Sequence, residues 1–105
     1  IIVSEAGPTA HAAEIARNWD ADYVFSHTSG RFNKSRALNL GSALAHQDIL
    51  VWSDSDIVFE SEFLLHACDE FHRRKLDLLQ PLSAIYYLSE MDTERVCRGE
   101  HVFSQ

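Results

Sequence analysis

Apolar and polar positions along the chain follow two periodicities, and these predict strands alternating with helices. Residues 1–4 and 22–27 are short apolar runs bounded by loop-forming residues, which is typical of strands. The segments behind them, residues 9–19 and 34–45, carry apolar side chains at near-helical spacing. Residues 49–52 form a third apolar run, for which we predict a third strand.

The second half of the chain continues this alternation. Residues 63–75 predict an amphipathic helix capped by Ser61, with basic side chains in the last turn, where they suit the helix dipole. Residues 78–82 are predicted to form a strand stopped or edged by a proline, and residues 84–88 to extend the sheet. A short helix is expected over residues 89–98.

This order of elements predicts the fold class. Strands that alternate with helices of about 10–15 residues indicate βαβ units. We therefore expect a three-layer α/β fold with a mainly parallel sheet flanked by helices, and a single domain spanning residues 1–105. Trp19 and Trp52 are expected in its core or against its sheet. Because the chain begins inside an apolar strand, we expect a truncated domain whose exposed sheet edge favours a homodimer.

Composition narrows the class of protein. The chain has 105 residues, of which 46% are hydrophobic and 24% charged, as in one globular domain. Its net charge of −7 argues against nucleic-acid binding through a broad basic surface. Cys68 and Cys97 lack C-x-x-C spacing and fit a reduced compartment or a single bridge. No apolar run is long enough to cross a membrane, so a soluble, cytoplasmic protein is expected.

Two carboxylates follow the third apolar run. Asp54 and Asp56 are two residues apart, so an extended backbone would direct both to one side, with Cα atoms roughly 6.5–7 Å apart. Such a pair repels unless a cation lies between the carboxylates, and oxygen ligands favour Mg²⁺ or Mn²⁺. Ligands of parallel sheets bind at this carboxyl end of the strands. The alternative is an ordinary turn, because Asp and Ser cluster where strands end.

A basic loop lies upstream of this acidic pair. Arg31, Lys34 and Arg36 are three of the nine basic residues of an acidic chain, and a Gly-containing loop leads them into a helix. A helix N-terminus with such side chains can hold a phosphate, and Phe32 could stack on a base. The alternative is a solvated loop that balances nearby carboxylates. Together the two clusters suggest a nucleotide diphosphate bridged by a metal to Asp56, a good leaving group.

The same residues resemble a known family. Residues 32–41 (F-N-K-S-R-A-L-N-L-G), followed by an apolar strand and D-S-D, resemble the nucleotide-sugar half of GT-A glycosyltransferases. Both family 2 and the β-1,4-galactosyltransferases are similar, and the latter have F-N-R-A-K-x-L-N-x-G before their D-x-D. The resemblance implies transfer of a sugar from a nucleotide diphosphate sugar, with a UDP-sugar as the expected donor, to a carbohydrate acceptor.

The resemblance also implies roles for individual residues. Asp56 would ligate the metal, normally Mn²⁺, and Asp54 would serve the ribose or the water shell of the metal. Phe32 and Lys34 would approach the uridine part of the donor, with Lys34 where the galactosyltransferases have arginine. Arg31 and Arg36 would be further donor-binding residues, whereas Asn39 and Gly41 would fix the helix against the sheet.

Two alternatives to this function stay open at the level of sequence. One is a nucleotidyltransferase on a related sheet, which also uses carboxylate-held Mg²⁺ but needs a glycine-rich triphosphate loop near its first strand. The other is a non-catalytic domain that keeps the fold for protein contacts. No catalytic base is assigned, and the fragment alone is expected to be inactive.

Overall fold

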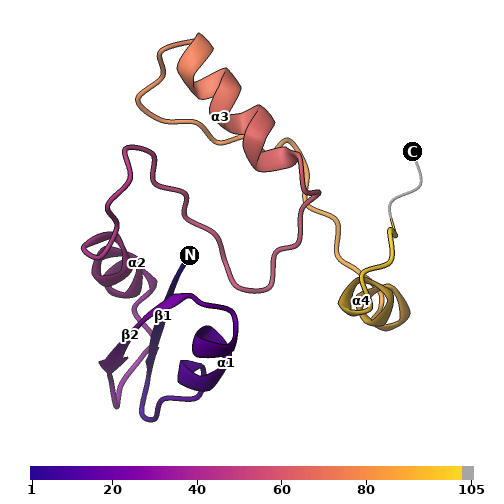
Figure 1. Ribbon diagram of the computed structural model, residues 1–105. Coiled ribbons are helices and arrows are strands. Elements are labelled where there is room, and N and C mark those ends of the chain that lie inside the picture. Colours follow the sequence, from indigo (N-terminus) through magenta and orange to yellow (C-terminus); the bar gives the residue numbers. More distant parts are fainter. Residues whose placement is uncertain (103–105) are drawn as a thin grey trace. The chain divides into compact units, whose positions relative to one another are not determined.

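A computed structural model describes residues 1–102 of the chain. Its contacts divide the chain into two compact units, residues 1–59 and the part from residue 60 onward. The single domain predicted for the whole chain is not tested by this division, and its last three residues lie outside the described part. The elements of the first unit, drawn in Figure 1, are β1 (Ile2–Gly7), α1 (Ala13–Asn18), β2 (Asp22–His27) and α2 (Lys34–Ser42).

The two strands form a parallel pair. Ile2 lies opposite Asp22, and the register continues to Gly7 opposite His27. The backbone N–H of Thr28 donates to the carbonyl of Gly7 at 2.9 Å, so the pairing extends to the ends of both strands. β1, α1 and β2 therefore make a βαβ unit, which confirms the predicted α/β class and parallel pairing. A homodimer through the sheet edge stays a prediction.

α2 packs on the face of the sheet that carries Ser4. The Ser4 hydroxyl donates to the carbonyl of Ala37 at 2.6 Å, and Ala37 is buried. A Cβ added to Gly41 would lie 3.2 Å from the Ser4 Cβ, so the helix approaches the strand closely only because this residue has no side chain. The structural role predicted for Gly41 is confirmed.

α1 begins four residues later than the sequence pattern predicts, at Ala13 rather than residue 9. The reason lies in Glu5, which follows Ser4 on β1 and so points to the opposite face of the sheet. Its carboxylate accepts the backbone N–H groups of His11 (2.9 Å) and Ala12 (3.0 Å). These bonds hold the residues before α1 in a loop.

The second unit contains two helices, α3 (Phe63–Arg73) and α4 (Glu90–Cys97). The predicted short helix is confirmed, and the hydroxyl of Ser89 caps α4 by accepting the backbone N–H of Asp92 at 3.1 Å. The predicted cap of α3 is wrong, because its N-cap position is Glu62 and no side-chain cap bond forms there. Cys68 and Cys97 are free, so the single-bridge alternative is not realised.

Three predicted strands are absent from the described residues. Residues 49–52, 78–82 and 84–88 form neither helix nor strand. A strand needs a hydrogen-bonded partner, and within residues 1–102 the sheet consists of β1 and β2. The two-stranded sheet of the described residues therefore does not confirm the predicted three-layer arrangement.

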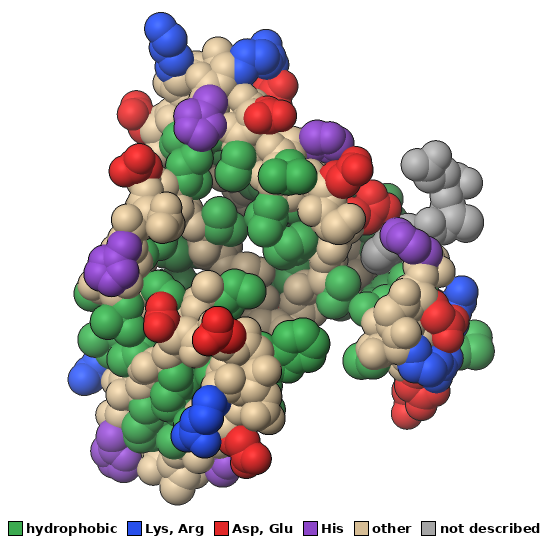
Figure 2. Space-filling view, viewed as in Figure 1, with side chains coloured by type: hydrophobic (Ala, Val, Ile, Leu, Met, Phe, Trp, Pro, Cys, Tyr) green, Lys and Arg blue, Asp and Glu red, His purple; other side chains and the backbone are tan. Residues whose placement is uncertain are grey.

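The buried core is small. Among the described residues, the buried hydrophobic side chains are Ala16 and Ala37. Trp19 and Trp52, predicted to lie in the core or against the sheet, are 81% and 60% exposed, so the predicted burial is wrong. Figure 2 shows other hydrophobic side chains at the surface. The expected core of a globular domain is therefore not assembled within the described part.

Candidate functional site

The basic loop joins the carboxyl end of β2 to α2. The hydroxyl of Thr28 accepts the backbone N–H of Gly30 at 3.3 Å, which gives the loop a local turn. Asn33 then caps α2, because its side-chain oxygen accepts the backbone N–H of Arg36 at 2.9 Å. The cap makes Lys34 the first residue of the helix. The predicted start of this helix is confirmed, although it ends at Ser42 rather than residue 45.

An ion pair connects the basic loop with the acidic pair. The Nζ atom of Lys34 lies 2.5 Å from Oδ1 of Asp54. The two side chains are 57% and 46% exposed, so the pair lies at the surface and is open to a ligand. Two segments that are separated by twenty positions in the sequence, and that were each proposed to bind the same ligand, therefore meet at the N-terminus of α2.

A second contact fixes the direction of the chain beside α2. The indole N–H of Trp52 donates to the hydroxyl of Ser42 at 3.0 Å, and that hydroxyl donates to the carbonyl of Leu38 at 2.7 Å. Trp52 thus meets the end of α2, whereas Asp54 meets its beginning. The chain from Trp52 to Asp54 runs opposite to the helix, which is the direction of the next parallel strand after a crossover helix. These two contacts hold the irregular segment beside α2.

Asp54 and Asp56 lie in a turn rather than at the end of a strand. The backbone N–H of Ile57 donates to the carbonyl of Asp54 at 3.3 Å, which closes the turn. The prediction that an extended backbone directs both carboxylates to one side loses its basis here. Asp56 is exposed. Within residues 1–102, no group of three or more His, Cys, Asp or Glu side chains could hold a metal ion.

The charge at the N-terminus of α2 is unusual for a helix. Lys34 and Arg36 lie in the first turn, which contains no acidic residue. Backbone N–H groups already give this end a partial positive charge, so cationic side chains are unfavourable there for the helix itself. Asp54 supplies the compensating carboxylate from another segment. Arg31 and Phe32 are exposed in the adjoining loop, the latter to 62%. The arrangement suits a flat, anionic ligand.

A polar cluster that the sequence did not predict lies on the other face of the sheet. The Tyr23 hydroxyl donates to the Glu5 carboxylate at 2.6 Å. This bond, with the backbone N–H of Ala12, holds the pKa of Glu5 below its ordinary value of 4.5. The same bond, together with burial, raises the pKa of Tyr23 to about 12. An acidic residue in an apolar strand was the one available signal for this cluster.

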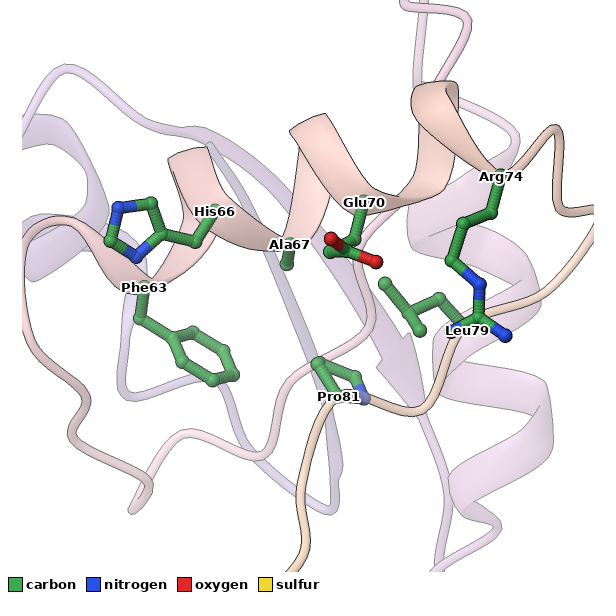
Figure 3. A pocket seen from close by; sticks show the side chains of 7 residues that line it. All are labelled: Phe63, His66, Ala67, Glu70, Arg74, Leu79 and Pro81. Atoms are coloured by element: carbon green, nitrogen blue, oxygen red, sulfur yellow. The ribbon is translucent and has the colours of Figure 1, made fainter.

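An open groove of about 250 Å³ lies along α3 in the second unit. Figure 3 shows the side chains that line it, namely Phe63, His66, Ala67, Glu70, Arg74, Leu79 and Pro81. None of the predicted site residues is among them, and the Glu70 carboxylate is already paired with Arg73 at 2.6 Å. The groove therefore adds no catalytic group to the candidate site.

The structure thus defines a parallel α/β protein in which a basic, aromatic loop and an acidic turn meet at one helix N-terminus. Comparison with protein families identifies the class further, because the model of glycosyl transferase family 2 matches residues 1–96. The chain belongs to this family, which confirms the family predicted from the sequence. No significant match was found among curated proteins or among solved structures.

Membership of the family indicates that the protein is a glycosyltransferase, with a nucleotide-sugar donor and an acceptor as substrates. It favours glycosyl transfer over the nucleotidyltransferase alternative. None of the helices within residues 1–102 has the length and apolar character to cross a membrane.

Proposed function

We propose that residues 1–59 hold the nucleotide diphosphate of a UDP-sugar in a metal-dependent glycosyltransferase that acts on a carbohydrate acceptor. The observation that carries this proposal is the ion pair between Lys34 and Asp54. It brings together the two sequence blocks that resemble the donor-binding half of GT-A enzymes, including the β-1,4-galactosyltransferases. A contact between them is what one shared ligand requires.

The basic residues would bind the diphosphate. Lys34 and Arg36 lie in the first turn of α2, and Arg31 precedes them in the loop. Their charges join the partial positive charge of the helix end, so a phosphate group there receives charge-assisted hydrogen bonds. This local positive charge stands out in a chain of net charge −7. Cations placed where they disfavour the helix are a sign that ligand binding, rather than stability, maintains them.

The remaining residues would bind the nucleoside. Phe32 offers an exposed aromatic face beside the phosphate site, which suits stacking on a planar base. Asp54 is within reach of Lys34 and can accept hydrogen bonds from the ribose hydroxyls. Uridine is proposed from the resemblance of residues 32–41 to the galactosyltransferase segment.

The acidic turn supplies the carboxylates that we propose for a hard divalent ion. Its two carboxylates, Asp54 and Asp56, offer oxygen ligands on an exposed turn. Mg²⁺, and Mn²⁺ by its similar preference for oxygen, commonly use one or two carboxylates and complete their coordination with phosphate oxygens and water. Asp56 would be the main ligand and Asp54 the second. When bound, the ion would neutralise the negative charge that develops on the departing diphosphate.

Calorimetry of UDP binding in the presence of Mn²⁺ tests the proposal. We expect Asp56→Ala to weaken metal-dependent UDP binding at least about tenfold, as loss of a metal ligand should. Asp69→Ala is the matched control, because Asp69 is an exposed aspartate on α3 and its removal changes the net charge equally. Failure of the protein to bind UDP with Mn²⁺, or equal binding by the two variants, would contradict the proposal.

A further inference from the structure

A buried hydroxyl on β2 has no hydrogen-bond partner among the described residues. Ser26 is 6% exposed, and its Oγ atom meets no donor or acceptor in this part of the chain. A buried polar group that is left unpaired lowers stability, and native proteins retain few such groups. The stability of the free protein therefore does not explain why β2 carries a serine at this position.

The register of the sheet places Ser26 level with the start of α2. Ser26 lies opposite Ala6, which follows Ser4 by two residues and so shares the face on which α2 packs. Ser4 contacts Ala37, and two strand residues span roughly 6.6 Å, a little more than one turn of helix. Because α2 runs opposite to the strands, as a crossover helix does, the next turn in this direction contains its N-cap, Asn33. The unpaired hydroxyl is thus directed to the side of the sheet where α2 begins.

The groups at this end of α2 are mainly hydrogen-bond donors. Helix geometry leaves the backbone N–H groups of the first turn without intrahelical partners, and the Asn33 side chain satisfies that of Arg36. Lys34 and Arg36 add cationic side chains in the same turn. A ligand that pairs with such donors needs several acceptor oxygens and negative charge, and a phosphate group has both. A serine hydroxyl can donate to the same group.

We propose that Ser26 is a nucleotide-binding residue whose hydroxyl donates a hydrogen bond to a phosphate oxygen of the sugar donor. The inference rests on the proposed function and adds a buried residue of β2 to its phosphate site. The free protein keeps an unpaired hydroxyl because the nucleotide supplies the partner.

The loop between β2 and α2 must shift to admit the phosphate oxygen, because Ser26 is buried in the free protein. Residues 29–33 are exposed and form neither helix nor strand. The bond from the Gly30 N–H to the Thr28 hydroxyl, at 3.3 Å, is long. Segments with exposed residues and few buried contacts open at a low cost in free energy. The loop can therefore move while β2 and α2 keep their places.

Two measurements on Ser26→Ala test the inference. Calorimetry in a buffer that contains Mn²⁺ should show UDP bound about tenfold more weakly, because a hydrogen bond to a charged phosphate is lost. Urea denaturation without UDP should show a midpoint that is unchanged or higher, because the variant no longer buries an unpaired hydroxyl. A hydroxyl with a structural role would give the opposite pattern, with a lower midpoint and unchanged UDP affinity.

Ser4→Ala is the matched control. Ser4 lies on the same face of the neighbouring strand, but its hydroxyl already has a partner, the carbonyl of Ala37 at 2.6 Å. Loss of this bond should lower the urea midpoint and leave UDP affinity unchanged. The two serines thus separate a ligand-binding hydroxyl from a structural one.

The failure of this inference and that of the proposed function can be distinguished. If the unmodified protein binds UDP and Ser26→Ala binds it equally well, Ser26 has no role in the phosphate site and the proposed function stands. A urea midpoint that falls in Ser26→Ala would also overturn the inference, since the hydroxyl would then have a partner in the free protein. If the unmodified protein does not bind UDP in the presence of Mn²⁺, the inference and the proposed function are both wrong.

Discussion

The bond between Tyr23 and Glu5 makes a residue-scale prediction about alkaline pH. Because the pKa of Tyr23 is raised to about 12, its contribution to stability is complete below the unfolded value of 10 and is lost as the pH rises through 12. Absorbance at 295 nm should therefore resolve one of the three tyrosines titrating near pH 12. Tyr23→Phe should remove that step. A Tyr23 that titrates near pH 10 in the folded protein would contradict the contact.

Substitution of Glu5, the acceptor of this hydrogen bond, is the control for the Tyr23 prediction. The lowered pKa of Glu5 means that its contribution to stability is present above its ordinary value of 4.5 and is lost as the pH falls below it. Glu5→Gln should weaken the dependence of stability on pH in that acidic range. It should also return the Tyr23 titration towards its ordinary range, because the charged acceptor is gone. Urea denaturation at several pH values measures the first effect.

Individual residues differ in how far their roles could be predicted. Lys34 and Asp54 were identified because basic and acidic residues clustered beside predicted element ends. Their ion pair was not predicted, since it depends on the path of the chain between them. Glu5 was missed altogether. A carboxylate that binds backbone N–H groups six and seven residues later forms no local pattern that distinguishes it from any other acidic residue.

At the scale of elements, Gly41 controls how closely α2 approaches β1. Alanine would gain about 1 kcal/mol of helix propensity over glycine, but its Cβ would lie 3.2 Å from the Ser4 Cβ. We expect this crowding to cancel most of the gain for Gly41→Ala. Gly41→Val, which adds two further methyl groups at the same contact, should destabilise the protein by about 1–3 kcal/mol.

Urea denaturation of both variants measures these differences. Gly30→Ala is the control, because a Cβ at Gly30 would meet no atom within 4 Å and the residue lies outside α2. Stability that rises in Gly41→Val would show that the helix and strand are not in contact at this position.

Elements defined by local sequence were predicted well. β2 has the predicted bounds, and the start of α2 follows from its Asn33 cap. The strand predicted over residues 49–52 was not found, because an apolar run encodes a tendency to be buried but not the partner that completes a strand.

At the scale of the whole molecule, composition predicted more burial than the described residues achieve. With 46% hydrophobic residues, the chain has the material for a core, yet Trp19, Leu78 and Tyr87 are each more than four-fifths exposed. Exposed apolar surface of this extent is typical of regions that pack against other protein. Membership of the glycosyltransferase family could still be predicted, since it depends on local blocks of sequence rather than on completion of the core.

The contrast between hydrogen-bonded elements and irregular segments predicts how local stability varies along the chain. Backbone amides in the β1–β2 ladder and in α2 should exchange with deuterium most slowly, because regular hydrogen bonds hold them. Those of residues 49–53 and 77–88, which form no helix or strand in the described part, should exchange fastest. If UDP and Mn²⁺ bind as proposed, residues 31–36 and 52–56 should become protected together. Slow exchange over residues 49–52 without any ligand would mean that they pair as the predicted strand after all.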